Sequence, residues 1–199
     1  MDELEVNWEQ ERPSQIQLVG LWAKMKFERV ENWTSSTEVL IEKIGETHVN
    51  GGIQLHRYQV SSNDHFNWFA SRNRLDEIDF VKKTLRHKNL SDYRNDLEIK
   101  SKPEIQITKS WTDMYDLPGR LARILGQGGA YKKINQKEAW EVVTDFIKSE
   151  FDNRFEEVLL FDFAIKNAEW FFDIAWDYST MLFDKRNYTV TIIDITDTD

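Results

Sequence analysis

The chain has 199 residues, a formal net charge of −9 at pH 7 and no cysteine. This length fits one large domain or two small ones, and the lack of cysteine excludes a disulfide scaffold, a thiolate zinc site and a cysteine nucleophile. The negative charge argues against nucleic acid as a partner, because phosphate binding depends on clustered Lys and Arg, and it favours a basic protein partner.

The chain carries no recognisable targeting segment. Its first residues, MDELEVNWEQERPSQ, have neither a basic n-region nor an apolar h-region, so no signal peptide is expected. The apolar runs are far shorter than a membrane span, so no membrane association is expected. Together with the lack of cysteine, which suits a reducing compartment, these features predict a cytoplasmic protein.

In the first half of the chain, turn and cap residues mark most of the predicted elements. The pattern over Trp22–Val30 favours a strand, although a helical face also fits it. Asn50-Gly51-Gly52 predicts a hairpin turn between residues 47–49 and a strand over Ile53–Val60. Asn73, as a helix cap, predicts a helix over residues 74–88.

Two helices are predicted in the middle of the chain. Pro118 suits the first turn of a helix from Asp116 to Leu125, and the glycines in residues 126–129 end it. Asn135 stands where a capping box would begin a second helix, and apolar residues repeat along one face of residues 136–151.

The last part of the chain reads as strands separated by turns. Strands are predicted over residues 157–164, 170–176, 178–183 and 188–195, although the spacing within Glu169–Tyr178 also fits a helix. Helices followed by such a meander predict an α+β fold, with helices packed on an antiparallel β-meander formed largely by the C-terminal third. We expect one domain over residues 1–199, with a division into 1–109 and 110–199 as the alternative.

The best candidate site lies among aromatic residues and carboxylates near the C-terminus. Carboxylates recur through this stretch and are expected to give the sheet an acidic rim; they are Asp173, Asp177, Asp184, Asp194, Asp197 and Asp199. Trp is enriched at interface hot spots, so the contact residues we predict for a partner are Trp170, Asp173, Trp176 and Asp177. Paired carboxylates also bind Mg²⁺ or act as acid and base, so the alternative to partner binding is a metal-dependent hydrolase that uses Asp173 and Asp177.

A second candidate is the glycine-rich segment that follows the first of the two helices. Gly128 and Gly129 would let backbone amides approach an anion, with Lys132 and Lys133 supplying charge. The competing interpretation is an ordinary helix end and connector.

Arginines and histidines give weaker signals. Asp116 and Arg120 have the spacing of a helix-surface ion pair, and Asp113 and Arg123 lie nearby, where two arginines could hold an anion. The histidines, which are His48, His56, His65 and His87, form no metal-binding motif. No catalytic residue, metal site or cofactor is therefore predicted.

Two segments carry a resemblance to known proteins. LPGRLARILGQGGAY (117–131) and the tail AWDYSTMLFDKRNYTVTIIDITDTD resemble a family of uncharacterised small acidic bacterial proteins. The Leu117-Pro118 and Gly128-Gly129 elements also resemble the "LP…GG" element of the SUKH immunity superfamily. The resemblance implies a non-enzymatic protein-binding module, and in its most specific form an immunity-type inhibitor whose acidic aromatic surface meets a bacterial toxin.

Overall fold

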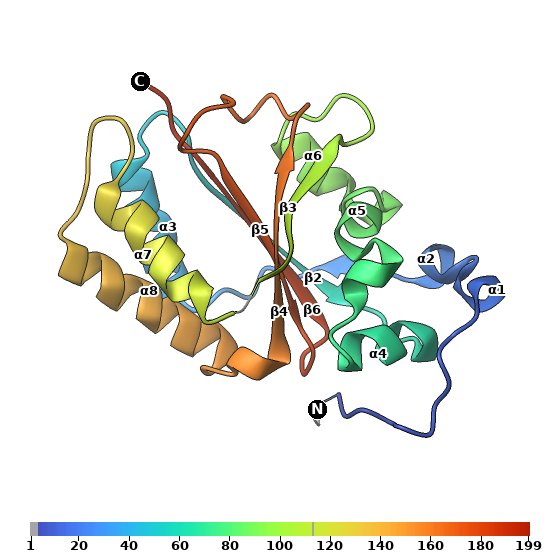
Figure 1. Cartoon of the computed structure of the whole chain (residues 1–199). Helices are drawn as coiled ribbons and strands as arrows, with labels where there is room; N and C mark the ends of the chain where they lie inside the picture. Colours follow the sequence, from blue (N-terminus) through green and yellow to red (C-terminus); the bar gives the residue numbers. More distant parts are fainter. Residues whose placement is uncertain (1–3, 113) are drawn as a thin grey trace.

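An antiparallel sheet runs through the middle of the molecule, and helices cover both of its faces (Figure 1). This computed structural model describes residues 4–112 and 114–199, and within them the sheet has six strands in the order β1-β2-β6-β5-β4-β3. The strands are β1 (Phe27–Arg29), β2 (Gly52–Val60), β3 (Ile105–Thr112), β4 (Val158–Ile165), β5 (Tyr178–Asp184) and β6 (Thr189–Thr196). The predicted α+β class is confirmed, and β4, β5 and β6 form the C-terminal meander.

The three strands of the meander are apolar on both sides. In β6, Val190 and Ile192 face one hydrophobic core, whereas Ile193 and Ile195 face the other. Successive side chains of a strand point to opposite faces, so a strand buried on both sides becomes a nearly continuous apolar run. This explains why the C-terminal third of the sequence looks uniformly hydrophobic.

One helical layer consists of three longer helices on a single face of the sheet (Figure 1). These are α3 (Ser35–Thr47), α7 (Asp116–Gln127) and α8 (Gln136–Phe151). The prediction for residues 136–151 matches α8, and Asn135 caps it by accepting a hydrogen bond from Lys137 N at 2.8 Å. The helix predicted from Asp116 is also confirmed, and Gly128 stands at its C-terminal cap with φ of 72°.

Shorter helices cover the opposite face. They are α1 (Gln15–Leu18), α2 (Leu21–Lys24), α4 (Asp64–Ser71), α5 (Phe80–Leu85), α6 (Ser91–Asp96) and the 3₁₀ turns η1 (Leu75–Ile78) and η2 (Lys88–Leu90); a further 3₁₀ turn, η3 (Phe155–Glu157), leads into β4. The single helix predicted over 74–88 is therefore wrong. Asn73 and Asp79 adopt φ of 56° and 53°, and this left-handed backbone interrupts the helical path on both sides of η1.

The predicted hairpin at Asn50-Gly51-Gly52 is also wrong. Residues before this turn end α3 instead of forming a strand, and β2 pairs with β1 and β6. A turn does occur at these residues, but it joins α3 to β2 and not two strands. Trp22–Val30 combines both interpretations, because α2 ends at Lys24 and β1 begins at Phe27.

The strand predicted over 170–176 does not exist, and neither does the alternative helix. Strands β4 and β5 are hydrogen-bonded neighbours, with Phe163 opposite Ser179, so the residues between them have to turn back on themselves. Residues 166–177 form a loop of turns and bends, which we name the β4–β5 loop.

Strands from both halves of the chain join in this sheet, since β2 pairs with β6 and β3 pairs with β4. The alternative domain boundary at residue 109 falls inside β3. Within the described ranges, no helix has the length and apolar composition needed to cross a bilayer.

Candidate functional site

The β4–β5 loop crosses one end of the sheet and carries all four residues predicted to contact a partner (Figure 1). The structure gives these residues different roles. Asp173 is at the surface, with 90% of its side chain exposed, and forms an ion pair with Lys166 at 3.3 Å. Trp170 is half-buried and packs edge-on against Phe171, with ring centroids 5.0 Å apart.

Asp177 holds the loop closed. One carboxylate oxygen accepts a hydrogen bond from Ile174 N at 3.1 Å, and the other accepts one from Thr196 Oγ1 at 2.5 Å. Both oxygens are therefore engaged with the protein itself. Asp177 fixes the loop to the end of β6, and this structural task explains its presence without a partner or a metal.

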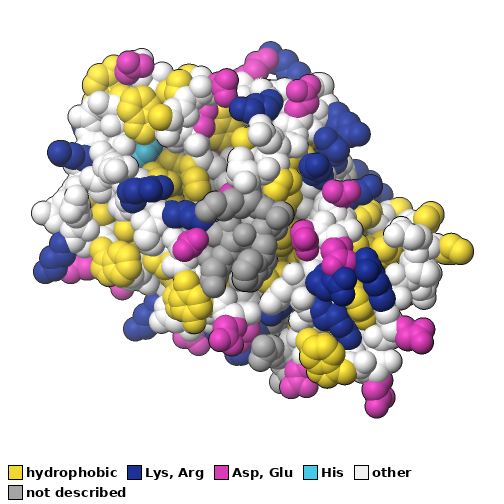
Figure 2. Space-filling model, in the orientation of Figure 1, with side chains coloured by type: hydrophobic (Ala, Val, Ile, Leu, Met, Phe, Trp, Pro, Cys, Tyr) yellow, Lys and Arg dark blue, Asp and Glu magenta, His cyan; other side chains and the backbone are white. Residues whose placement is uncertain are grey.

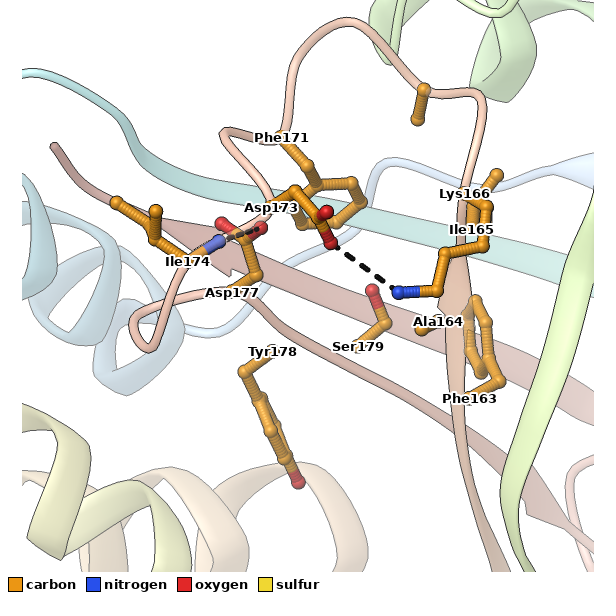
Figure 3. A pocket seen from close by; sticks show the side chains of 11 residues that line it. Phe163, Ala164, Ile165, Lys166, Phe171, Asp173, Ile174, Asp177, Tyr178 and Ser179 are labelled. Atoms are coloured by element: carbon orange, nitrogen blue, oxygen red, sulfur yellow. Dashed lines mark hydrogen bonds and ion pairs between the residues drawn. The ribbon is translucent and has the colours of Figure 1, made fainter.

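A pocket of about 230 Å³ lies beneath the loop (Figure 3). Phe163, Phe171 and Ile174 line its walls, the Asp173–Lys166 ion pair stands at the side, and Ser179 lies on β5 (Figure 3). Tyr178 points the other way, towards α7 and α8. The pocket therefore belongs to the face of the sheet that the short helices cover.

Behind Ser179 lies a buried carboxyl group. Asp194 of β6 is 0% exposed and accepts a hydrogen bond from Ser179 Oγ at 2.6 Å. Burial raises the pKa of Asp194 to about 7, because a carboxylate loses its hydration inside the core.

The glycine-rich segment already binds an anion that belongs to the protein. Asp197 is fully buried and accepts hydrogen bonds from Ala130 N at 2.7 Å and from Asn50 N at 2.9 Å. A Cβ on Gly129 would overlap the Asp197 carboxylate. The anion site predicted at Gly128 and Gly129 is therefore occupied by the side chain of Asp197, which directly follows β6.

Lys132 and Lys133 do not join this arrangement. Both side chains are exposed to solvent, and a Cβ on Gly128 would overlap the carbonyl group of Lys132, so only its backbone packs against the glycine. Gly128 ends α7 and Gly129 lets Asp197 approach closely, which fits the competing interpretation of a helix end and connector.

The predicted acidic rim is wrong, because three of its six carboxylates are buried and Asp177 is half-buried and bonded within the protein. Asp184 is 2% exposed and receives both guanidinium arms of Arg154 at 3.0 and 2.6 Å, while Asp194 and Asp197 are fully buried. On the face shown in Figure 2, the described Lys and Arg side chains lie between Asp and Glu side chains instead of leaving a separate acidic area.

The arginines, aspartates and histidines that gave weaker signals in the sequence are mostly paired or buried. Asp116 and Arg120 form the expected ion pair at 3.1 Å, and Arg120 also bonds Asp162 of β4; Asp113 lies outside the described residues. His48, His56 and His87 are buried. Within the described part of the chain, no group of three or more His, Cys, Asp or Glu could hold a metal ion.

The tryptophans whose side chains the structure describes divide between core and surface. Trp68 is buried and donates its indole hydrogen to Gln10 O at 3.0 Å, whereas Trp8 and Trp140 are 82% and 52% exposed. Trp176 is half-buried and lines a second, larger cavity on the other face of the sheet. The tryptophans of the β4–β5 loop are therefore less exposed than expected.

Sequence reasoning missed the apolar residues that the β4–β5 loop does expose. Phe172 is 44% and Ile174 is 37% exposed, and they stand on either side of Asp173. The sequence does contain an aromatic and an aliphatic residue on either side of Asp173. The strand prediction over 170–176 assigned them to a sheet, so their exposure was not expected.

Comparisons with known proteins add no family. No protein-family model matches the chain, and no curated protein matches it. The functional argument therefore depends on the residues and their geometry.

Proposed function

We propose that the chain is a non-enzymatic protein-binding module and that the β4–β5 loop is its contact surface for a basic protein. The observation that carries this proposal is the exposure of Phe172 and Ile174, at 44% and 37%, around an aspartate whose side chain is 90% exposed. Burying these apolar groups would supply affinity, and Asp173 would pair with a Lys or Arg of the partner.

The rest of the loop supports such a role by being anchored. Asp177 fixes the loop to β6, and Trp170 and Phe171 pack against the core beneath α4 to α6. A loop held in place loses little conformational freedom when a partner binds, so more of the contact energy is left for affinity.

The most specific form of the proposal is an immunity-type inhibitor that covers the basic cleft of a bacterial toxin in the cytoplasm. The supporting observations are the net charge of −9, which would speed association with a basic partner, and the resemblance of the two sequence segments. The lack of cysteine suits a reducing compartment.

The test is affinity capture of the tagged full-length chain from a lysate of its own source, with proteins read by mass spectrometry and affinities measured on the purified partner. We expect a stoichiometric basic protein whose binding is lost in a Phe172→Ser/Asp173→Lys variant. Both positions are exposed, but Asp173 has a left-handed backbone with φ of 57°, which lysine adopts less readily than aspartate, so circular dichroism checks that the variant folds.

A matched control is available on α8. Trp140 is 52% exposed and Asp145 is also at the surface, so Trp140→Ser/Asp145→Lys makes the same chemical change on another face. If the control variant lost the partner and the loop variant kept it, the contact surface would lie elsewhere and the proposal would be wrong.

A further inference from the structure

A cavity of about 580 Å³ lies on the face of the sheet opposite the pocket beneath the β4–β5 loop. It is bordered by the C-terminal end of α7, the glycine turn and the end of the β4–β5 loop, and its lining includes His48, Arg120, Arg123, Gln127 and Trp176. Cavities of about 300–1,000 Å³ hold small molecules in known proteins.

His48 presents an unused hydrogen-bond acceptor at this cavity. The residue is 1% exposed, and its Nδ1 lies 2.9 Å from Thr47 Oγ1. The Thr47 hydroxyl is also 3.1 Å from the carbonyl oxygens of Lys43 and Ile44, which can only accept a hydrogen bond. We therefore assign the hydroxyl hydrogen to these carbonyls. The hydroxyl oxygen then accepts from His48, so the ring hydrogen is assigned to Nδ1.

The other ring nitrogen, Nε2, is therefore an acceptor, and it is buried without a hydrogen-bond partner among the described residues. Burial also lowers the pKa of His48, so the ring is neutral near pH 7. A buried acceptor left without a donor costs free energy, and a ligand N–H or O–H would remove that cost.

Arg123 supplies an available positive charge beside it. Its neighbour Arg120 is committed to Asp116 and Asp162. Arg123 lies one helical turn further along α7, is exposed, and forms no hydrogen bond or ion pair with any residue the structure describes.

The nearby carboxylates do not compete strongly for this arginine. Asp177 is bonded to Ile174 N and Thr196 Oγ1, and Asp197 is bonded to Asn50 N and Ala130 N. One guanidinium without a partner next to these carboxylates suits a ligand with a single anionic group better than one with several.

We propose that this cavity binds a nucleoside monophosphate. Arg123 would pair with the phosphate, the half-buried Trp176 would stack against the base, and His48 Nε2 would accept a hydrogen bond from an N–H group of the base. This site uses Trp176 at the end of the β4–β5 loop, but none of the exposed residues Phe172, Asp173 and Ile174 that carry the protein-binding proposal. It places the anion at Arg123 instead of at Lys132 and Lys133.

Calorimetric titration of the full-length chain with AMP tests the proposal, with inorganic phosphate and adenosine as separate probes. We expect saturable binding of AMP and binding at least about tenfold weaker for either fragment, since each makes only part of the contacts. Arg123→Gln should weaken AMP binding by about tenfold or more without affecting folding, because the side chain is exposed.

Two further variants separate this site from its alternatives. His48→Phe keeps an aromatic ring of similar size but removes the acceptor, so it should weaken AMP without weakening phosphate. Lys132→Gln/Lys133→Gln is the matched control and should leave binding unchanged, because both side chains are exposed away from the cavity. The proposal fails if AMP does not bind at millimolar concentration, or if the lysine variant loses binding and Arg123→Gln keeps it.

Discussion

Replacing the buried Asp194 by Asn should change how the stability of the protein depends on pH. Asp194 is 0% exposed, lies in the central strand β6, and accepts a hydrogen bond from Ser179 Oγ at 2.6 Å. Burial raises its pKa from the ordinary value of 3.8 to about 7. Asparagine has nearly the same shape and can still accept the hydrogen bond from Ser179, but it carries no charge at any pH.

The sign follows from proton binding. Between the ordinary pKa and the raised one, the folded chain keeps a proton on Asp194 that the unfolded chain has lost, so the stabilisation is complete at low pH and is lost as the pH rises through about 7. From about pH 5 to about pH 8 the loss amounts to roughly 3 kcal/mol, since one pH unit corresponds to about 1.4 kcal/mol.

Urea denaturation of the wild type and of Asp194→Asn at both pH values measures this difference. We expect the stability of the variant relative to the wild type to increase by roughly 3 kcal/mol from the lower pH to the higher one. The buried histidines His48, His56 and His87 have lowered pKa values, chiefly because of burial, and produce a slope of the opposite sign. They are common to both proteins, so the difference between the proteins isolates Asp194.

A difference between the two proteins that stays constant across this pH range would refute the reasoning. It would mean that Asp194 does not carry a raised pKa in the folded state. Such a result would also mean that no protonated carboxyl group lies behind Ser179 in the pocket beneath the β4–β5 loop.

Two further predictions concern buried contacts between segments far apart in sequence. Glu150→Gln removes the charge that faces Arg57 Nη2 at 2.6 Å, and thermal unfolding near neutral pH should show a loss of about 3 kcal/mol. Burial alone would raise the pKa of Glu150, but the hydrogen bond from Thr37 and the charge of Arg57 lower it below its ordinary value. The stabilisation from the Glu150–Arg57 pair is therefore present at neutral pH and is lost as the pH falls below the ordinary range of a glutamate. If the wild type and Glu150→Gln lost stability equally as the pH fell, this reasoning would be contradicted. Gly129→Ala places a Cβ against the Asp197 carboxylate and should cost about 2 kcal/mol in urea denaturation, whereas Gly45→Ala, where an added Cβ meets nothing, should not destabilise the protein.

Two polar clusters stand back to back on the meander, and each lies beside one of the two cavities. Ser179 and Asp194 lie on the face covered by the short helices, beneath the β4–β5 loop. Asp162 and Tyr178 lie on the other face, where Arg120 bonds Asp162 beside the larger cavity. Adjacent residues of β5 reach both clusters because successive side chains of a strand point to opposite faces.

Local features of the sequence determined the elements whose causes are themselves local. Asn135 and the repeat of apolar residues placed α8, Pro118 and the glycines placed α7, and the apolar runs with their turn placed β5 and β6. Caps, turns and periodicity act within a few residues, so the sequence contains them directly.

Only the tertiary structure decided which carboxylates are available. Asp197 is buried, where it bonds Asn50, 147 residues earlier, and Ala130, 67 residues earlier, whereas the sequence placed it in an acidic rim. Strand pairing forced residues 166–177 into a loop and so exposed Phe172, while Asp177 was bound to Thr196. The spacing of an aspartate along the chain does not reveal whether a distant amide or hydroxyl will meet it, and that contact separates a structural carboxylate from one that can bind a partner.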